Sequence, residues 1–256
     1  MVGDIIIKMN DEYLDGVSSS DFSKKLKEIQ GEFKLTFLRG EEEKNVTLSL
    51  GTIVLKSVAS EVFNNEIGYI SISVFANNTY DQMKNILEEL ENKGIKSLII
   101  DVRSNTGGYL SSVDNILGLF LDSTKVIYQI KDKIGTKKYY SKGNTNKEYD
   151  IIILTNGASA SASEILTAAL KENLNALSVG KKTFGKGSAQ KMHTLSNGTK
   201  YKFTSQKWLT PLGNSIDGIG VDVDFDIDLD EIYYQEPSFE NDNQLQKAIS
   251  LLNDKK

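Results

Sequence analysis

Residues 151–173 read IIILTNGASASASEILTAALKEN, and this stretch sets the fold class. The apolar run Ile151–Leu154 has the length of a buried strand, and residues 160–173 have the pattern of a helix. Only small and polar residues lie between them, so the strand passes into the helix through a short junction. A strand that leads directly into a helix is the repeating unit of an α/β fold.

The same alternation of strands and helices continues on both sides of this stretch. Further strands are predicted at 67–75, 95–102, 126–130 and 177–179, with helices at about 83–90 and after Gly108. The first fifty residues differ, because they read as one strand, one helix and a hairpin. We therefore expect a small unit over residues 1–50 and a larger α/β unit over residues 51–256.

Composition excludes several classes of function. The chain has 256 residues and a net charge of −5, which argues against a nucleic-acid-binding protein. It has no cysteine and one histidine, which excludes disulfides, thiolate nucleophiles and metal sites built from several histidines. No apolar run approaches the ~18 residues that a membrane-spanning helix needs. The aspartate-rich run 221–229 lacks the pattern of a calcium loop, and its alternation predicts a strand with one acidic face.

The serines of the strand–helix junction are the first candidates for chemistry. A serine there can present its hydroxyl beside free helix N–H groups, which suit a developing oxyanion, although the same serines can simply cap the helix. A nucleophilic serine needs a base. His193 has the usual titration range for a base but sits in an ordinary strand context. Lys186 lies between two glycines, and a lysine becomes a base when burial lowers the pKa of its ammonium group.

Two segments taken together resemble the carboxy-terminal processing (tail-specific) serine peptidases, which contain a PDZ domain. These are Gly157–Ile165 and Thr183–Gly187, which place Ser161 and Lys186 25 residues apart. Residues 101–108 resemble the family's loop after the first strand of the peptidase core, and residues 207–220 resemble its later strand and turn. Residues 3–10 resemble the back half of the PDZ domain. The resemblance implies a ClpP/crotonase-like peptidase core preceded by a partial PDZ-like unit.

The resemblance also implies a role for individual residues. Ser161 is the expected nucleophile and Lys186 the expected general base. Gln190 is the preferred third residue, which would orient the lysine, and Glu172 is the alternative because it lies about three helical turns after Ser161.

The oxyanion donors carry over from the family as main-chain N–H groups. One is the N–H of Ala162, directly after the nucleophile. The other comes from the glycine pair Gly107 and Gly108, where a side chain would obstruct the scissile carbonyl group.

The implied activity is that of a serine endopeptidase that cuts protein or peptide substrates near apolar C-terminal tails through an acyl-enzyme. No metal or other cofactor and no nucleic acid is expected, and the oligomeric state stays open. The alternative is a catalytically inactive peptide-binding or scaffold module of the same fold. Family members work outside the cytoplasm, often anchored to the membrane by a leading segment that this sequence lacks. We also expect a front PDZ half upstream, and hence weak capture of C-terminal carboxylates by residues 1–50.

Overall fold

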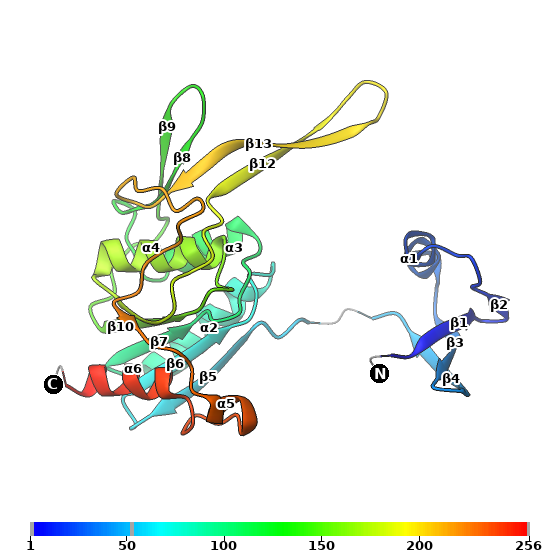
Figure 1. Cartoon of the computed structure of the whole chain (residues 1–256), viewed down its shortest axis with the longest axis horizontal. Helices are drawn as coiled ribbons and strands as arrows, with labels where there is room; N and C mark the ends of the chain where they lie inside the picture. The colour runs from blue at the N-terminus through cyan, green and yellow to red at the C-terminus, as the bar shows by residue number, and fades with distance from the viewer. Residues whose placement is uncertain (1–2, 52–53, 255–256) are drawn as a thin grey trace. The chain divides into compact units, whose positions relative to one another are not determined.

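The structure is a computed structural model that describes residues 3–51 and 54–254, without the side chains of residues 190 and 191. The chain divides into two compact units, Met1–Val54 and Leu55–Lys256 (Figure 1). Each unit has its own sheets and its own buried side chains, and each is described separately below.

The first unit is an antiparallel sheet with one helix. Its strands are β1 (Ile5–Met9), β2 (Glu12–Tyr13), β3 (Glu32–Arg39) and β4 (Glu42–Ser49), in the order β2-β1-β3-β4. Helix α1 (Ser19–Glu28) begins after Ser18, whose hydroxyl oxygen accepts a hydrogen bond from Asp21 N. The strand, the helix and the hairpin expected from the sequence are thus present. The likeness of this unit to a PDZ domain stays a prediction.

The second unit is built on a six-stranded sheet with the order β14-β11-β10-β7-β6-β5. All neighbouring strands are parallel except β5, which runs antiparallel to β6 at one edge. The strands are β5 (Val58–Phe63), β6 (Ile67–Ile72), β7 (Ser97–Asp101), β10 (Asp150–Thr155), β11 (Leu177–Gly180) and β14 (Phe225–Asp226). The central strands are apolar because both of their faces are covered, as is usual for parallel sheets.

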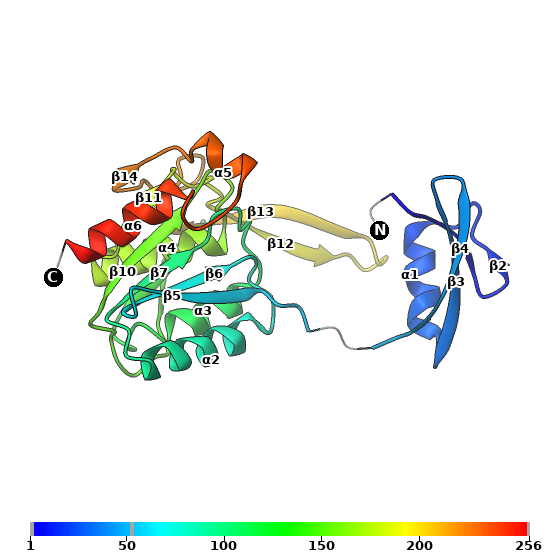
Figure 2. The same cartoon turned by 90° about the horizontal axis from the view of Figure 1, so that it is seen from below.

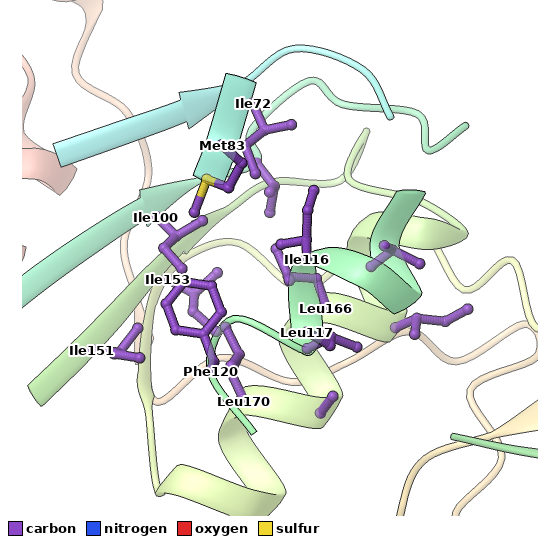
Figure 3. Close-up of a cluster of buried hydrophobic side chains, with 14 of the residues drawn as sticks. Ile72, Met83, Ile100, Ile116, Leu117, Phe120, Ile151, Ile153, Leu166 and Leu170 are labelled. Atoms are coloured by element: carbon purple, nitrogen blue, oxygen red, sulfur yellow. The ribbon is translucent and has the colours of Figure 1, made fainter. Parts of the chain in front are cut away.

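Helices cover both faces of this sheet (Figure 2). Helices α2 (Thr79–Asn92), α3 (Leu110–Leu117) and α4 (Ala162–Leu174) lie on one face, and α6 (Asn243–Asn253) lies on the other. The larger core packs side chains such as Met83, Ile116 and Leu166 against the strand residues Ile100 and Ile153 (Figure 3). A short helix, α5 (Glu231–Gln235), precedes α6. The α/β fold expected from the sequence is confirmed.

A second, antiparallel sheet has the order β12-β13-β8-β9. Its strands are β8 (Val126–Lys131), β9 (Thr136–Tyr140), β12 (Ser188–Thr194) and β13 (Lys200–Leu209). They form two hairpins that extend away from the layered core (Figure 1). Gly198 between β12 and β13 has a φ of 83°, which a tight hairpin turn needs.

The aspartate-rich run departs from the strand predicted for it. Only Phe225 and Asp226 form a strand, although apolar and exposed acidic residues do alternate from 221 to 230. The acidic side chains make separate ion pairs, because Lys171 binds Asp224, Lys181 binds Asp226 and Asp228, and Lys182 binds Asp222. The prediction of a full strand is therefore wrong, while the alternation behind it is real.

Candidate active site

The junction between β10 and α4 singles out one of its three serines. The hydroxyl of Ser159 donates to Val102 O at 2.7 Å and that of Ser163 to Asn105 O at 2.8 Å, and both side chains are fully buried. Ser161 is partly exposed and is the N-cap of α4, with φ 56° and ψ −112°. Non-glycine residues rarely adopt this backbone conformation, and such strain is concentrated at functional sites. Of these three serines, Ser161 is therefore the one with a partly exposed side chain.

The main chain around Lys186 is fixed by close packing. A Cβ atom on Gly185 would lie 2.9 Å from Ile219 N, and one on Gly187 would lie 2.6 Å from Asp217 N. Both glycines are therefore required because the segment 216–220 passes directly against them. The indole Nε1 of Trp208 donates to Lys186 O at 2.7 Å. The lysine side chain, by contrast, is exposed.

A buried glutamate joins the serine and lysine segments. The carboxylate of Glu164 is fully buried, and its Oε2 accepts hydrogen bonds from Ser161 N at 2.8 Å and from Lys186 N at 2.9 Å. Its Oε1 accepts from Gly185 N at 2.7 Å and from Thr183 Oγ1 at 2.6 Å. The two amide nitrogens that share Oε2 therefore lie less than about 6 Å apart, twice a normal hydrogen-bond length.

Sequence reasoning assigned no role to Glu164. The sequence does contain a pattern that indicates a structural role for this residue, because a glutamate three residues after a serine at the start of a helix is a capping box. In this chain the pattern has a second effect, since the same carboxylate also holds the main chain of Lys186.

The main chain of Gly107 passes close to Ser161 and Ala162. Gly107 has a φ of 105°, and a Cβ atom there would lie 2.9 Å from Ser161 Cβ, so the glycine loop passes directly beside the serine. Gly107 N already donates to Asn105 Oδ1 at 2.9 Å. The first N–H groups of a helix have no partner within the helix, and Ala162 is the first residue of α4. Gly108 and Ala162 are therefore the better pair of donors for an oxyanion.

The glycine loop is anchored from two directions. The side-chain amide of Asn105 is fully buried and donates to Ile72 O at 2.8 Å. Arg103 pairs with Asp101 and with Asp242, each at 2.6 Å, and Asp242 belongs to the C-terminal segment. Although burial opposes the charge of Arg103, the hydrogen bonds to these two carboxylates raise its pKa. The loop thus starts from a rigid, fully paired cluster.

A cleft of about 430 Å³ contains Ser161, Lys186 and Gly108. Its apolar lining comes from Leu110, Tyr128, Ile130, Ile165 and Trp208. Burial and the neighbouring Asp114 raise the pKa of Tyr128, so its hydroxyl stays protonated and donates to Asp114 Oδ2 at 3.2 Å. The cleft can therefore receive an apolar side chain next to the serine.

Ser161 and Lys186 share this cleft, but no hydrogen bond joins their side chains in the described part of the chain. A lysine acts as a base when it is buried beside apolar groups, whereas the side chain of Lys186 is exposed in the structure. Because its main chain is fixed next to Ser161, rotation about its flexible four-carbon stem is the movement that would bring the two groups together.

Two other candidates from the sequence, Glu172 and His193, do not line this cleft. Glu172 accepts a hydrogen bond from Leu212 N at 2.7 Å and lines a different cleft. It lies on the same helix as Ser161, but eleven residues correspond to about 16 Å along the helix axis. His193 is exposed on β12 and stacks on Tyr201. Gln190 belongs to β12, and its side chain is outside the described part of the structure.

Residues 3–51 and 54–254 contain no group of three or more histidine, aspartate or glutamate side chains that could hold a metal ion. No helix among them is long and apolar enough to cross a membrane.

Comparison with known proteins adds sequence relatives. Peptidase family S41 matches residues 66–227. The "Probable CtpA-like serine protease" of Staphylococcus aureus is 34% identical over 232 residues, which cover 88% of this chain and 46% of that protein. The protein of the same name from Staphylococcus epidermidis is 34% identical over 228 residues. The chain therefore spans about half the length of these curated relatives.

Solved structures with a similar fold include a processing protease. The photosystem II D1 C-terminal processing protease matches with a TM-score of 0.64 and 27% identity, over 88% of this chain and 63% of that one. A lipoprotein from Streptococcus agalactiae has the same fold, with a TM-score of 0.60 and 20% identity over 78% of this chain and 70% of its own. The resemblance drawn from the two sequence segments is thus confirmed at the level of the family. This chain belongs to peptidase family S41.

Proposed function

We propose that the chain carries the catalytic machinery of a serine endopeptidase that cuts proteins near their C-terminal tails, with Ser161 as nucleophile and Lys186 as general base. The observation that carries this proposal is the Glu164 carboxylate, which holds the main chains of both residues beside one cleft. The apolar lining of that cleft supports substrates with apolar side chains next to the cut bond. The relatives named above support the same class of activity.

The reaction divides into two steps. Neutral Lys186 takes the proton of the Ser161 hydroxyl while Oγ attacks the carbonyl carbon, and the N–H groups of Gly108 and Ala162 stabilise the resulting oxyanion. The lysine then gives its proton to the leaving amine as the C–N bond breaks, which leaves an ester on Ser161. A water molecule then gives a proton to Lys186 as it attacks this ester. Lys186 passes that proton to Ser161 Oγ as the C–O bond to the serine breaks, which releases the new carboxyl terminus and restores both residues.

The third member of the triad belongs to the same proposal. Gln190 follows Lys186 by four residues on β12, and we assign it the role of orienting the lysine. Glu172 is the weaker candidate, because it lines a different cleft. The action on C-terminal tails and the extracytoplasmic location, with any membrane anchor outside this sequence, are also part of the proposal.

Cleavage of unfolded casein tests the proposal. We expect the wild-type chain to cut casein and both Ser161→Ala and Lys186→Ala to lose at least about 10³ of the rate. Lys182→Ala is the matched control, because Lys182 is an exposed lysine near the same segment that pairs with Asp222 outside the cleft. If the wild type and the two dyad variants behave alike, the peptidase assignment fails. The exposed Lys186 would then favour the inactive scaffold module.

A further inference from the structure

The nucleophile and the glycine pair lie on two loops that leave the same edge of the main sheet. Strands β7 and β10 are parallel neighbours, with Asp101 opposite Leu154. The glycine loop, residues 102–109, follows β7, and the serine loop, residues 156–161, follows β10. The distance between the nucleophile on one loop and an oxyanion donor on the other therefore depends on the contacts that join the two loops.

One side-chain amide bonds to both loops. Oδ1 of Asn156 accepts a hydrogen bond from Ser104 N in the glycine loop at 2.9 Å and one from Ala158 N in the serine loop at 3.1 Å. Its Nδ2 donates to Ser104 Oγ at 3.2 Å. The main chain of Asn156 is itself fixed, because its N–H donates to Ser159 Oγ at 3.0 Å. We call the pair Asn156 and Ser104 the loop clamp.

Ser104 has a backbone conformation that needs such a clamp. Its φ is 60°, in the left-handed region that non-glycine residues rarely adopt. The nucleophile Ser161, with φ 56°, has the same feature. In both cases a side-chain oxygen accepts the N–H of the strained residue, from Asn156 for Ser104 and from Glu164 for Ser161. Strain of this kind persists only where the surrounding structure fixes it.

The other contacts between the loops do not hold this turn directly. Groups of the serine loop and of α4 donate to Val102 O and Asn105 O, on either side of Ser104. Among the described residues, the hydrogen bonds to Ser104 itself come from Asn156. The clamp is therefore the contact that maintains the left-handed turn.

The turn at Ser104 directs the residue that supports the glycine pair. Oδ1 of the next residue, Asn105, accepts a hydrogen bond from Gly107 N at 2.9 Å. From the other side, Phe75 N donates to Gly107 O at 3.0 Å. If Ser104 relaxed to a negative φ, the side chain of Asn105 would move, and the adjoining N–H of Gly108 would move with it.

The loop clamp lies outside the catalytic cleft. Asn156 and Ser104 line a separate cleft of about 260 Å³, together with Arg103 and Tyr233. Neither lines the cleft that contains Ser161. Asn156 can therefore affect the reaction through the glycine loop, without contact with a substrate in the catalytic cleft.

We infer that Asn156 is a positioning residue for the oxyanion site. Through Ser104 it keeps the glycine loop where the N–H of Gly108 meets the oxyanion that forms beside Ser161. The inference rests on the proposed function and adds a residue to its machinery. Because the oxyanion exists only after Oγ has attacked, a displaced donor weakens the transition state and leaves the binding of intact substrate unchanged. The loss of the clamp should therefore lower kcat and leave KM nearly constant.

Three variants of the full chain separate this role from a general effect on the fold. Asn156→Ala removes the clamp. Asn156→Asp restores it, because the carboxylate keeps the acceptor for both N–H groups and Ser104 Oγ can turn to donate to it. Asn243→Ala is the matched control, since this half-buried asparagine accepts from Asp230 N at 3.1 Å and donates to Asp228 O at 2.8 Å, outside both loops.

Two measurements are made on each variant. Cleavage of fluorescein-labelled casein gives kcat and KM, and inhibition by acetyl-Ala-Ala-phenylalaninal gives Ki. This aldehyde forms a hemiacetal with Ser161 Oγ, and the aldehyde oxygen takes the place of the oxyanion. We expect Asn156→Ala to lower kcat at least about tenfold, to change KM less than about threefold and to raise Ki at least about tenfold. Asn156→Asp should stay within about threefold of the wild type in both kcat and Ki, and Asn243→Ala should match the wild type.

An unchanged kcat or an unchanged Ki in Asn156→Ala overturns the inference. An equal loss in Asn243→Ala also overturns it, because a general loosening of the fold then accounts for both variants. If the wild type cuts no casein, the proposed function fails, and hydrogen–deuterium exchange still decides whether Asn156 holds the glycine loop. The N–H groups of Ser104 and Ala158 should exchange at least about tenfold faster in Asn156→Ala than in the wild type, and equal exchange rates overturn the clamp.

Discussion

Replacing Glu164 by glutamine tests whether one carboxylate assembles the site. Glu164 receives four hydrogen bonds, three of them from main-chain N–H groups, and it is fully buried. A glutamine amide would place an NH₂ group where one of the oxygens accepts. In either orientation this NH₂ group faces at least one main-chain N–H, which is left without an acceptor.

The magnitude follows from the number of groups left unpaired. A buried polar group without a partner costs about 1–3 kcal/mol, and hydrogen bonds to a charged acceptor are stronger than neutral ones. We therefore expect Glu164→Gln to lower the free energy of unfolding by about 2–4 kcal/mol, or Tm by roughly 5–15 °C. We also expect kcat to fall at least about tenfold with a smaller change in KM, because the main chains of Ser161 and Lys186 lose their common anchor.

The assay pairs urea unfolding with peptide cleavage at a temperature where the variant stays folded. Glu172→Gln is the matched control, because that glutamate accepts one N–H, from Leu212, at the end of the same helix. It should change the unfolding free energy by less than about 0.5 kcal/mol. If Glu164→Gln keeps the wild-type kcat and loses no more stability than Glu172→Gln, the carboxylate is not the anchor and the reasoning is refuted.

Three further predictions concern neighbouring groups. Gly108→Ala should lower kcat at least about 10²-fold, because its Cβ atom would lie 2.2 Å from Phe75 O and displace the oxyanion donor. Gly157→Ala is the control and should leave kcat unchanged, because a Cβ atom there meets open space. Equal kcat values for the two variants would contradict this. Arg103→Met should cost about 3–5 kcal/mol in urea unfolding, because it removes the cation that pairs with the buried carboxylates of Asp101 and Asp242. A cost under about 1 kcal/mol would count against this role. Burial raises the pKa of Asp114, whose Oδ1 has no hydrogen-bond partner among the described residues, so its protonated form favours the folded state and its charged form opposes it. Asp114→Asn should therefore raise Tm at pH 7, with the gain disappearing below about pH 4, and a gain that persists in acid would exclude this cause.

The layered core was predictable because its strands and helices have strong patterns. The run 151–154 and the helix after it were readable from apolar spacing alone, and they form β10 and α4 within two residues of the expected bounds. The aspartate-rich run was harder, because alternation along a segment does not tell whether a neighbouring strand is available to pair with it.

For the candidate site, the sequence could suggest residues but not the contacts between them. Sequence could name Ser161 and Lys186 but could not show that Glu164 links their main chains, because that link depends on the segment 183–187 folding back onto the start of α4. Sequence also could not show which of Gly107 and Gly108 has a main-chain N–H free for an oxyanion, since Gly107 N donates to the side chain of Asn105. Glu172 shows a further limit of sequence reasoning, because a shared helix face does not imply a short distance.

The indole that binds Lys186 O belongs to the only tryptophan in the sequence. Trp208 is buried at the wall of the catalytic cleft, so the intrinsic fluorescence of the whole chain originates largely from one position beside the lysine segment. A spectroscopist therefore needs no attached dye to follow what happens there. Changes in emission wavelength or quenching on mixing with peptide would report, in real time, the entry of a ligand or the reorientation of the lysine segment.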